Sequence, residues 1–324
     1  MSRMTRAVVW LLGAALLLGA PLAQARQAAA ASAPAHVPPV PLLWKVSGAP
    51  GSELYLLGSF HLLKPADYPL SGDVDTAFDA AQRLLFELPP EEMESPALAA
   101  QMLTAAMRRD GRQLQDDLDA HTWQRLQQYA AANGMPLDRL AGLKPWFVGL
   151  TISIAQMTRQ GLDPQSGLDR HLMTRAASAG KPAAGLETAA AQIAMLDGMS
   201  ADEQRQLLRE ALEQVDKGDA QGRRLHDAWR RGDETTLWRD MAAQMRRDYP
   251  ALYRRINTER NDAWLAPLQQ RLQAGQGVTL VVVGTLHLLG EDGVVEKLRA
   301  KGYRVERICS ACTPPKTGGR TKRP

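Results

Sequence analysis

The chain has 324 residues, of which 45% are hydrophobic and 23% are charged. This length and composition are those of a globular protein with a large core, which excludes a disulfide-stapled mini-protein and a mainly disordered chain. The 39 Lys and Arg residues outnumber the 35 Asp and Glu residues, but six of the basic residues and none of the acidic ones lie in the first 25 and last 12 positions. The remainder is nearly neutral, so we expect no nucleic-acid partner.

The N-terminus has the pattern of a secretion signal. Arg3 and Arg6 precede an apolar run over residues 7–20, and Ala23-Gln24-Ala25 follows it. A basic start, a short apolar run and an A-x-A site predict a signal peptide cleaved after Ala25. The apolar run is shorter than the roughly 20 residues that span a bilayer, although an uncleaved anchor is the alternative. We therefore expect a periplasmic or secreted protein with no integral membrane domain after cleavage.

The predicted elements begin after an Ala/Pro-rich tether at residues 26–41, whose composition does not pack a core. Two strand-like runs, 42–46 and 53–57, flank a turn rich in Gly and Pro, which predicts an antiparallel hairpin. A short helix at 73–82 and a buried strand at 83–88 come next.

The middle of the chain, about 91–273, has apolar residues at helical spacing and is predicted to be helical, except for a short strand at 181–186. Residues 279–283 (TLVVV) are the clearest β run, followed by a helix at 294–301 and a strand at 303–308. Because strands occur at both ends, we predict one α/β domain over residues 42–308. Its mixed sheet is formed by the N- and C-terminal segments, with a large helical insertion between them. Residues 309–324 are predicted to be a disordered basic tail.

A sequence repeat identifies the first candidate site residues. The segments 53–63 (ELYLLGSFHLL) and 279–289 (TLVVVGTLHLL) align without gaps, and each has an apolar strand, a glycine and then a histidine three residues later. The histidines are His61 and His287. Open α/β sheets bind ligands beyond the carboxyl ends of their strands, so two adjacent strands of this kind would bring both imidazoles to one point. A single such histidine would be an ordinary loop residue, but the pair indicates function.

Acidic and basic residues near these strands could complete a site. Glu87 ends the apolar run RLLFEL, where an unpaired charge would cost several kcal/mol, although it could instead begin an exposed loop. Glu187 ends the run KPAAGL in the same way, although it could instead cap the next helix. Asp169 is a weaker candidate, because acids are common at helix starts. Arg260 and Asn261 could bring a cation and an amide to the site, and a surface ion pair is the alternative for Arg260.

Together these segments resemble the TraB/GumN family, to which the animal Tiki proteins are related. The resemblance covers nearly all of residues 42–308 and rests on these motifs: LWKVSG, ELYLLGSFHLL, RLLFEL, GLKPWF, GLDRHL, GKPAAGLET, ERNDAW and VVVGTLHLLGEDGVVEKLRAKGYRV. The family commonly has threonine after the first glycine, where this chain has Ser59. Its fold is similar to that of erythromycin esterase-like and haem-binding ChaN-like proteins.

The resemblance implies a metal-dependent hydrolase. By analogy with the Tiki relatives, His61, Glu87 and His287 would hold a divalent ion such as Mn, Co or Zn, and Arg260 would support the reaction. Two imidazoles and a carboxylate suit such an ion, which would activate water against the carbonyl of a peptide or a small ester substrate. Glu187 or Glu87 would take the proton, and Arg260 would stabilise the oxyanion.

Two other functions remain open. A histidine and a glutamate can activate water without a metal, as the esterase-like relatives suggest. Alternatively, the chain could bind a peptide or haem without turnover. The sequence leaves the substrate and the oligomeric state open.

The cysteines Cys309 and Cys312 form a C-S-A-C segment after the last strand. In an oxidising compartment we expect them to form a small-loop disulfide rather than a redox pair or half of a zinc site.

Overall fold

The computed structural model describes residues 36–275 and 277–312, so the predicted signal peptide lies outside the described residues. Its centre is a six-stranded mixed sheet in the order β4-β3-β5-β2-β1-β6. The strands are β1 (Leu43–Ser47), β2 (Ser52–Ser59), β3 (Arg83–Phe86), β4 (Ala183–Gly185), β5 (Gly277–Gly284) and β6 (Arg304–Arg307). Each predicted strand is present within a few residues of its expected bounds.

Strand direction divides the sheet into two parts. The hairpin β1–β2 and the pair β1–β6 are antiparallel. Strands β2, β5, β3 and β4 are parallel to one another, so their carboxyl ends lie along the same edge. β2 and β5 lie side by side, as the repeat predicts, with Ser59 opposite Gly284. The glycines of the two motifs, Gly58 and Gly284, are therefore offset by one residue in the strand register.

The helical insertion is present and β4 interrupts it. One short helix, α1 (Gly72–Ala80), precedes β3, and α14 (Val294–Ala300) connects β5 to β6. The first arm of the insertion contains α2 (Pro90–Met93), α3 (Pro96–Ala106), α4 (Ala120–Ala132), α5 (Pro145–Arg159) and α6 (Leu168–Ser178). The second arm contains α7 (Ala189–Asp197), α8 (Ala201–Asp216), α9 (Asp219–Arg231), α10 (Glu234–Trp238), α11 (Gln244–Asp248), α12 (Pro250–Tyr253) and α13 (Glu259–Gln273).

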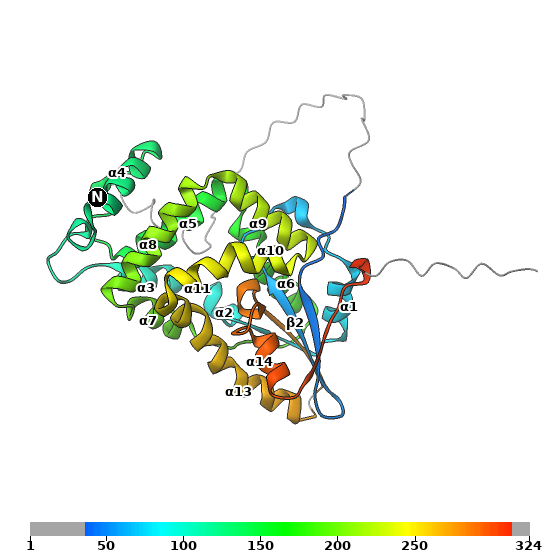
Figure 1. Cartoon of the computed structure of the whole chain (residues 1–324). Helices are drawn as coiled ribbons and strands as arrows, with labels where there is room; N and C mark the ends of the chain where they lie inside the picture. The colour runs from blue at the N-terminus through cyan, green and yellow to red at the C-terminus, as the bar shows by residue number, and fades with distance from the viewer. Residues whose placement is uncertain (1–35, 276, 313–324) are drawn as a thin grey trace, which may run out of the picture.

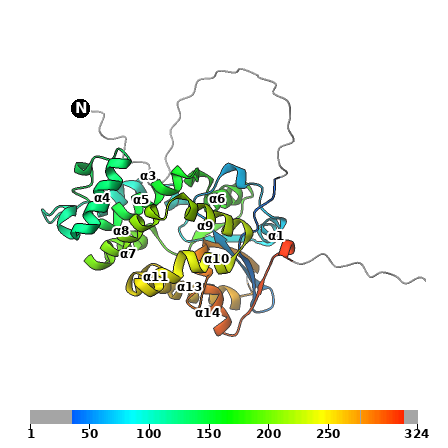
Figure 2. The same cartoon turned by 45° about the horizontal axis from the view of Figure 1, so that its top comes forward.

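Much of the insertion packs on itself rather than on the sheet. Figures 1 and 2 both show α3, α4, α5, α7 and α8 gathered on one side of the sheet. One buried cluster surrounds the strands and includes Trp44, Trp229 and Trp264. Two further clusters lie among the helices, one around Trp146 and one around Ile152. The insertion therefore has hydrophobic cores of its own.

The end of the predicted tether contacts the domain. Over residues 36–41 the chain has no regular structure, but Val40 N–H donates to the Arg230 carbonyl (2.7 Å). The Pro39 carbonyl accepts from Ser71 N–H (2.9 Å), and Arg230 also donates to the Val37 carbonyl. The last residues of the predicted tether are therefore held against the domain, because backbone groups without an element of their own find partners in α9 and beside α1.

The sequence predicts no integral membrane domain after cleavage of the signal peptide. Among the described residues, every helix is too short or too polar to cross a bilayer.

Candidate functional site

The site lies where four parallel strands end. Glu187 follows β4, Glu87 follows β3, and Gly284 ends β5. His287 lies in the short 3-10 helix η8 (Thr285–Leu288) directly after β5, and His61 follows β2 by two residues. Since these strands are adjacent in the sheet, their ends bring together residues that are far apart in the sequence.

His61 is the accessible imidazole, with 54% of its side chain exposed. Its Nδ1 lies 2.8 Å from Oδ2 of Asp169, and its Nε2 lies 3.8 Å from Oε1 of Glu87. Asp169 is buried in the first turn of α6, and its Oδ2 also accepts from the Ser59 hydroxyl. Desolvation opposes protonation of His61, but the Asp169 carboxylate outweighs it and raises the pKa of His61 to about 9.

The start of α6 reaches His61 because Gly167 has no side chain. A Cβ on Gly167 would lie 2.1 Å from the His61 carbonyl oxygen. This close approach places Asp169, two residues later, against the imidazole.

Glu87 is buried and held on both oxygens. Its Oε2 accepts from Nη2 of Arg260 (2.6 Å), and its Oε1 accepts from the Gly284 backbone N–H (2.7 Å). Burial would raise the pKa of this carboxyl, but Arg260, the two histidines and the Gly284 amide together hold it well below its usual range. Glu87 is therefore a carboxylate at neutral pH and a poor proton acceptor.

His287 is buried, unlike His61. Its Nδ1 lies 2.7 Å from Oδ1 of Asn261, and its Nε2 lies 3.0 Å from Nη1 of Arg260 and 3.9 Å from Oε1 of Glu87. Desolvation lowers the pKa of His287 to about 3, because the attraction of Glu87 is offset by the positive charges of Arg260 and His61. The imidazole is therefore neutral at pH 7.

Arg260 connects the acidic residues of the site. Its Nε donates to Oε1 of Glu187 (2.8 Å), while Nη2 contacts Glu87. Its Cζ also lies 5.1 Å from the ring centre of Trp264. Burial raises the pKa of Glu187 and Arg260 opposes this, so Glu187 holds a proton more readily than Glu87 does.

Comparison with known proteins identifies the family from nearly the whole domain. The TraB/PrgY/gumN family model matches residues 42–307. The chain belongs to the TraB/PrgY/gumN family. No curated protein and no solved structure matches it significantly.

In this TraB/PrgY/gumN chain, the structure brings together all five residues that the sequence singles out: His61, Glu87, Glu187, Arg260 and His287. It also gives direct imidazole contacts to the two weaker candidates, Asp169 and Asn261. Two contributors had no role in the sequence analysis. The Ser59 hydroxyl bonds Asp169, and the Trp264 ring lies 4.5 Å from that of His287. Ser59 aligns with Thr285 in the repeat, and ERNDAW contains Trp264, but neither pattern indicates these contacts.

A π-helical segment, η7 (Arg254–Thr258), directly precedes the residues that α13 contributes. Such segments change which side chains face inward and are frequent at functional sites. Here Arg260, Asn261 and Trp264 follow within two turns, and all three reach His287. Helix α13 of this TraB/PrgY/gumN chain thus supplies a guanidinium, an amide and an indole ring, and all three contact His287.

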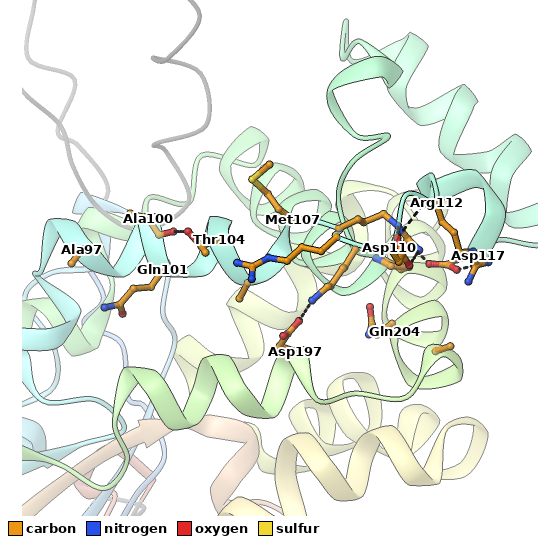
Figure 3. Close-up of a pocket in the computed structure, with 16 residues that line it drawn as sticks. Ala97, Ala100, Gln101, Thr104, Met107, Asp110, Arg112, Asp117, Asp197 and Gln204 are labelled. Carbon is orange, nitrogen blue, oxygen red and sulfur yellow. Dashed lines mark hydrogen bonds and ion pairs between the residues drawn. The ribbon is translucent and has the colours of Figure 1, made fainter.

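A cavity of about 950 Å³ lies elsewhere, within the helical insertion (Figure 3). Its wall includes Gln101 and Thr104 of α3, and the ion pair between Lys144 and Asp197 (2.5 Å) crosses it. None of the five predicted site residues lines this cavity. This cavity is therefore separate from the residues at the strand ends.

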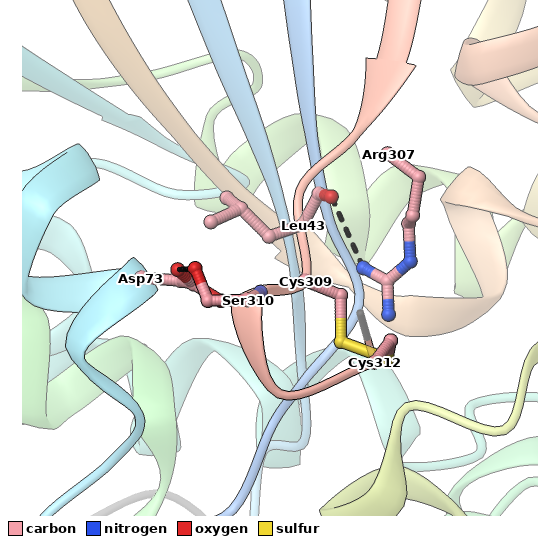
Figure 4. The surroundings of a disulfide bond; sticks show 6 residues. All are labelled: Leu43, Asp73, Arg307, Cys309, Ser310 and Cys312. Atoms are coloured by element: carbon pink, nitrogen blue, oxygen red, sulfur yellow. Dashed lines mark hydrogen bonds between the residues drawn. A yellow bond between two sulfur atoms is a disulfide. The ribbon is translucent and has the colours of Figure 1, made fainter. Parts of the chain in front are cut away.

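The two cysteines are joined at the end of the last strand (Figure 4). The bond between Cys309 and Cys312 encloses the 3-10 helix η9 (Ser310–Cys312), and Asp73 accepts from both the N–H and the hydroxyl of Ser310 (2.7 and 2.5 Å). The prediction of a disordered tail from residue 309 is therefore wrong for 309–312, because the disulfide and Asp73 hold these residues. Residues 313–324 lie outside the described part.

The atoms that would hold a divalent ion gather around Glu87, although among the described residues they are not spaced as an assembled metal site. Oε1 of Glu87 lies 3.8 and 3.9 Å from the Nε2 atoms of His61 and His287. A Cβ on Gly284 would lie 3.1 Å from both Glu87 Oε1 and His61 Nε2, so the glycine leaves room between the donors. Both Nδ1 atoms have hydrogen-bond partners, as metal-binding histidines usually do.

The contact from Arg260 limits this fit. Its Nη1 uses the same Nε2 lone pair of His287 that an ion would use. Within residues 36–275 and 277–312, no group of three or more His, Cys, Asp or Glu side chains is spaced as an assembled metal site. Ion binding and the bond from Nη1 to His287 are therefore mutually exclusive, whereas the bonds from Arg260 to the two glutamates are not.

Proposed function

We propose that the chain is a metal-dependent hydrolase, peptidase-like in its chemistry, which cleaves a peptide or a small ester at the ends of β2, β3 and β5. The observation that carries the proposal is that two histidine Nε2 atoms lie within 4 Å of one buried carboxylate oxygen, Glu87 Oε1. Imidazole nitrogen and carboxylate oxygen are the ligands that Zn²⁺, Co²⁺ and Mn²⁺ accept in proteins.

Each residue has a distinct task in this proposal. His61, His287 and Glu87 would hold the ion, which would lower the pKa of a water molecule and polarise a carbonyl. Asp169 orients His61 through Nδ1. Glu87 already accepts from Arg260 and Gly284, so Glu187, whose pKa is raised, is the better proton acceptor. Arg260 would release His287 and present its guanidinium to the developing oxyanion.

A second candidate is hydrolysis without a metal. It is favoured by the bond from Arg260 Nη1 to His287 Nε2, which occupies one of the three proposed metal ligands. In that case His61, paired with Asp169, would position a water molecule between its Nε2 and Glu87, and Glu187, whose pKa is raised, would accept the proton. Arg260 and the neutral His287 would then serve only in charge stabilisation.

One experiment separates these candidates. The mature protein is purified without added metal, its metal content is measured, and hydrolysis of a peptide library and of p-nitrophenyl acetate is followed before and after chelation. We expect bound metal and chelator-sensitive hydrolysis, both lost in H61A and H287A and both kept in H121A, which changes an exposed histidine of α4.

The other outcomes are equally clear. Hydrolysis that survives chelation but is lost in H61A supports the metal-free enzyme. Binding of peptide or haem without turnover overturns both enzymatic proposals, and so does full activity in H61A and H287A.

We also propose that the protein works outside the cytoplasm after removal of residues 1–25. The support is the n-region, apolar run and A-x-A pattern of the sequence, together with the disulfide between Cys309 and Cys312. N-terminal sequencing of the exported protein should begin at Arg26. A protein recovered in the cytoplasm with an intact N-terminus would contradict this.

A further inference from the structure

The two histidines of the repeat differ in the chemistry that faces their Nδ1 atoms. Nδ1 of His61 faces a carboxylate, Asp169 Oδ2, at 2.8 Å. Nδ1 of His287 faces an amide oxygen, Asn261 Oδ1, at 2.7 Å. A neutral imidazole has one N–H and one lone pair, and the partner at one nitrogen decides what the other nitrogen offers.

The orientation of the Asn261 amide is set by its second contact. Asn261 is fully buried, and its Nδ2 lies 2.7 Å from the backbone carbonyl oxygen of Asp292. A carbonyl oxygen can only accept, so the NH₂ group of Asn261 must face Asp292 and its oxygen must face His287. Because that oxygen also can only accept, Nδ1 of His287 must carry the hydrogen.

The contact at the other nitrogen of His287 leads to the same assignment. Nη1 of Arg260 lies 3.0 Å from Nε2, and a guanidinium can only donate. Nε2 must therefore present its lone pair. Both contacts require the neutral form with hydrogen on Nδ1, and no other form of the ring satisfies both.

We propose that Asn261 is a positioning residue that fixes His287 in the Nδ1–H tautomer, so that the Nε2 lone pair faces Arg260 and Glu87. Asn261 contacts Nδ1, whereas Arg260 and Glu87 lie at Nε2 on the other side of the ring. Asn261 therefore acts on the site through His287. The tautomer assignment stands on hydrogen-bond geometry. Its consequence for metal affinity rests on the proposed function.

The first test measures the tautomer directly. Protein labelled with ¹⁵N in its histidines is prepared free of metal at pH 7, and long-range ¹H–¹⁵N spectra distinguish protonated ring nitrogens from those with a lone pair. The variant H287Q assigns the signals of His287. We expect a protonated Nδ1 and a lone-pair Nε2. If the wild-type spectrum shows hydrogen on Nε2, or on both ring nitrogens, the proposal is overturned without the need for any variant.

Two variants separate positioning from simple structural support. N261D keeps an acceptor facing Nδ1, whereas N261L removes it, and both lose the bond to Asp292. We expect N261D to keep hydrogen on Nδ1, with or without a second proton on Nε2, and N261L to give a mixture of tautomers. The matched control is N257L. Asn257 is also fully buried and lies in η7, directly before α13, where its Nδ2 donates to the Tyr253 hydroxyl. A mixture in N257L, or none in N261L, contradicts the proposal.

Metal affinity provides the second readout. Titration with Zn²⁺ followed by calorimetry should show binding weakened 10- to 100-fold in N261L, the range typical for loss of a partner behind a ligand, and much less in N261D. If the wild-type protein binds none of Zn²⁺, Co²⁺ and Mn²⁺, the proposed metal-dependent function fails while the tautomer assignment stands. If Zn²⁺ binds wild type and N261L equally, the positioning role fails while the metal site stands.

Discussion

Nη2 of Arg260 lies 2.6 Å from Oε2 of Glu87, and both side chains are nearly buried. The same guanidinium also bonds Glu187 through Nε (2.8 Å). The arginine thus holds two carboxylates from neighbouring strand ends in one arrangement. Without it, both acids would lose the charged donor that bonds them at the sheet edge.

Replacing this arginine should destabilise the fold. R260L leaves two buried carboxylates without their cation, and removing one partner of a buried ion pair costs about 3–5 kcal/mol. Urea denaturation should show a loss of this size. In R260L/E87Q the loss should be smaller than in R260L, because one unpaired charge is gone. A loss below about 1 kcal/mol in R260L would show that the pair contributes no more than a surface ion pair does.

The space at Gly284 should be essential for the site but not for the fold. In G284A the new Cβ would lie 3.1 Å from both Glu87 Oε1 and His61 Nε2. The backbone of Gly284 has a φ of −49°, which alanine adopts without strain. We expect a small change in Tm and at least a tenfold loss of metal affinity and hydrolysis. G142A adds a Cβ in open space and should match wild type. Unchanged metal affinity in G284A would rule out an ion between these donors.

Asp169 should control the protonation of His61. In metal-free wild-type protein, a pH titration followed by NMR should place the pKa of His61 at about 9. D169N removes the charge that raises it, so the pKa should fall to or below 6.5, whereas S59A keeps the carboxylate and should leave the pKa raised.

The same shift predicts how stability depends on pH. Because the folded pKa of His61 lies above its unfolded value, the Asp169–His61 pair stabilises the protein fully below about pH 6.5. This contribution is lost as pH rises through about 9. D169N should abolish this loss of stability between pH 6.5 and 9. An identical pH profile in D169N would show that the pair does not stabilise the fold.

The elements and the main site residues were predictable because their signals are local. An apolar run followed by glycine and histidine specifies both the strand of His61 and its end, and a charge closing an apolar run marks Glu87. The contact of Asp169 with His61 was not predictable in this way. It depends on how closely α6 approaches the β2 end, and that approach is decided by packing at Gly167. The bond from Arg260 to His287 likewise depends on the direction in which the side chains of α13 point after the π-helical segment η7.

A second buried acid should limit stability in acid. Asp67 accepts from His226 Nε2 and from the Lys64 N–H, both at 2.8 Å, and it also pairs with Arg230. Burial raises the pKa of Asp67, but these donors outweigh it and the pKa is lowered.

Asp67 therefore stabilises the protein above its unfolded pKa near 3.8, and this stabilisation is lost as pH falls through the lower folded value. D67N should lower the free energy of unfolding at pH 7 by about 1–3 kcal/mol and flatten its dependence on pH below 4. D79N, at an exposed position of α1, should have neither effect. Wild-type acid sensitivity in D67N would assign that sensitivity to other carboxylates.

The position of β4 links the helical arms to the chemistry. This strand of three residues lies between the arms in the sequence, yet it joins the sheet beside β3 and delivers Glu187 to Arg260. A shortened protein without residues 91–273 would thus lose Glu187 and Arg260 along with the helices. A shortened version of the domain must therefore keep this strand and the start of α13, together with Asp169 of α6, which contacts His61, and Trp229 of α9, which packs in the core around the strands.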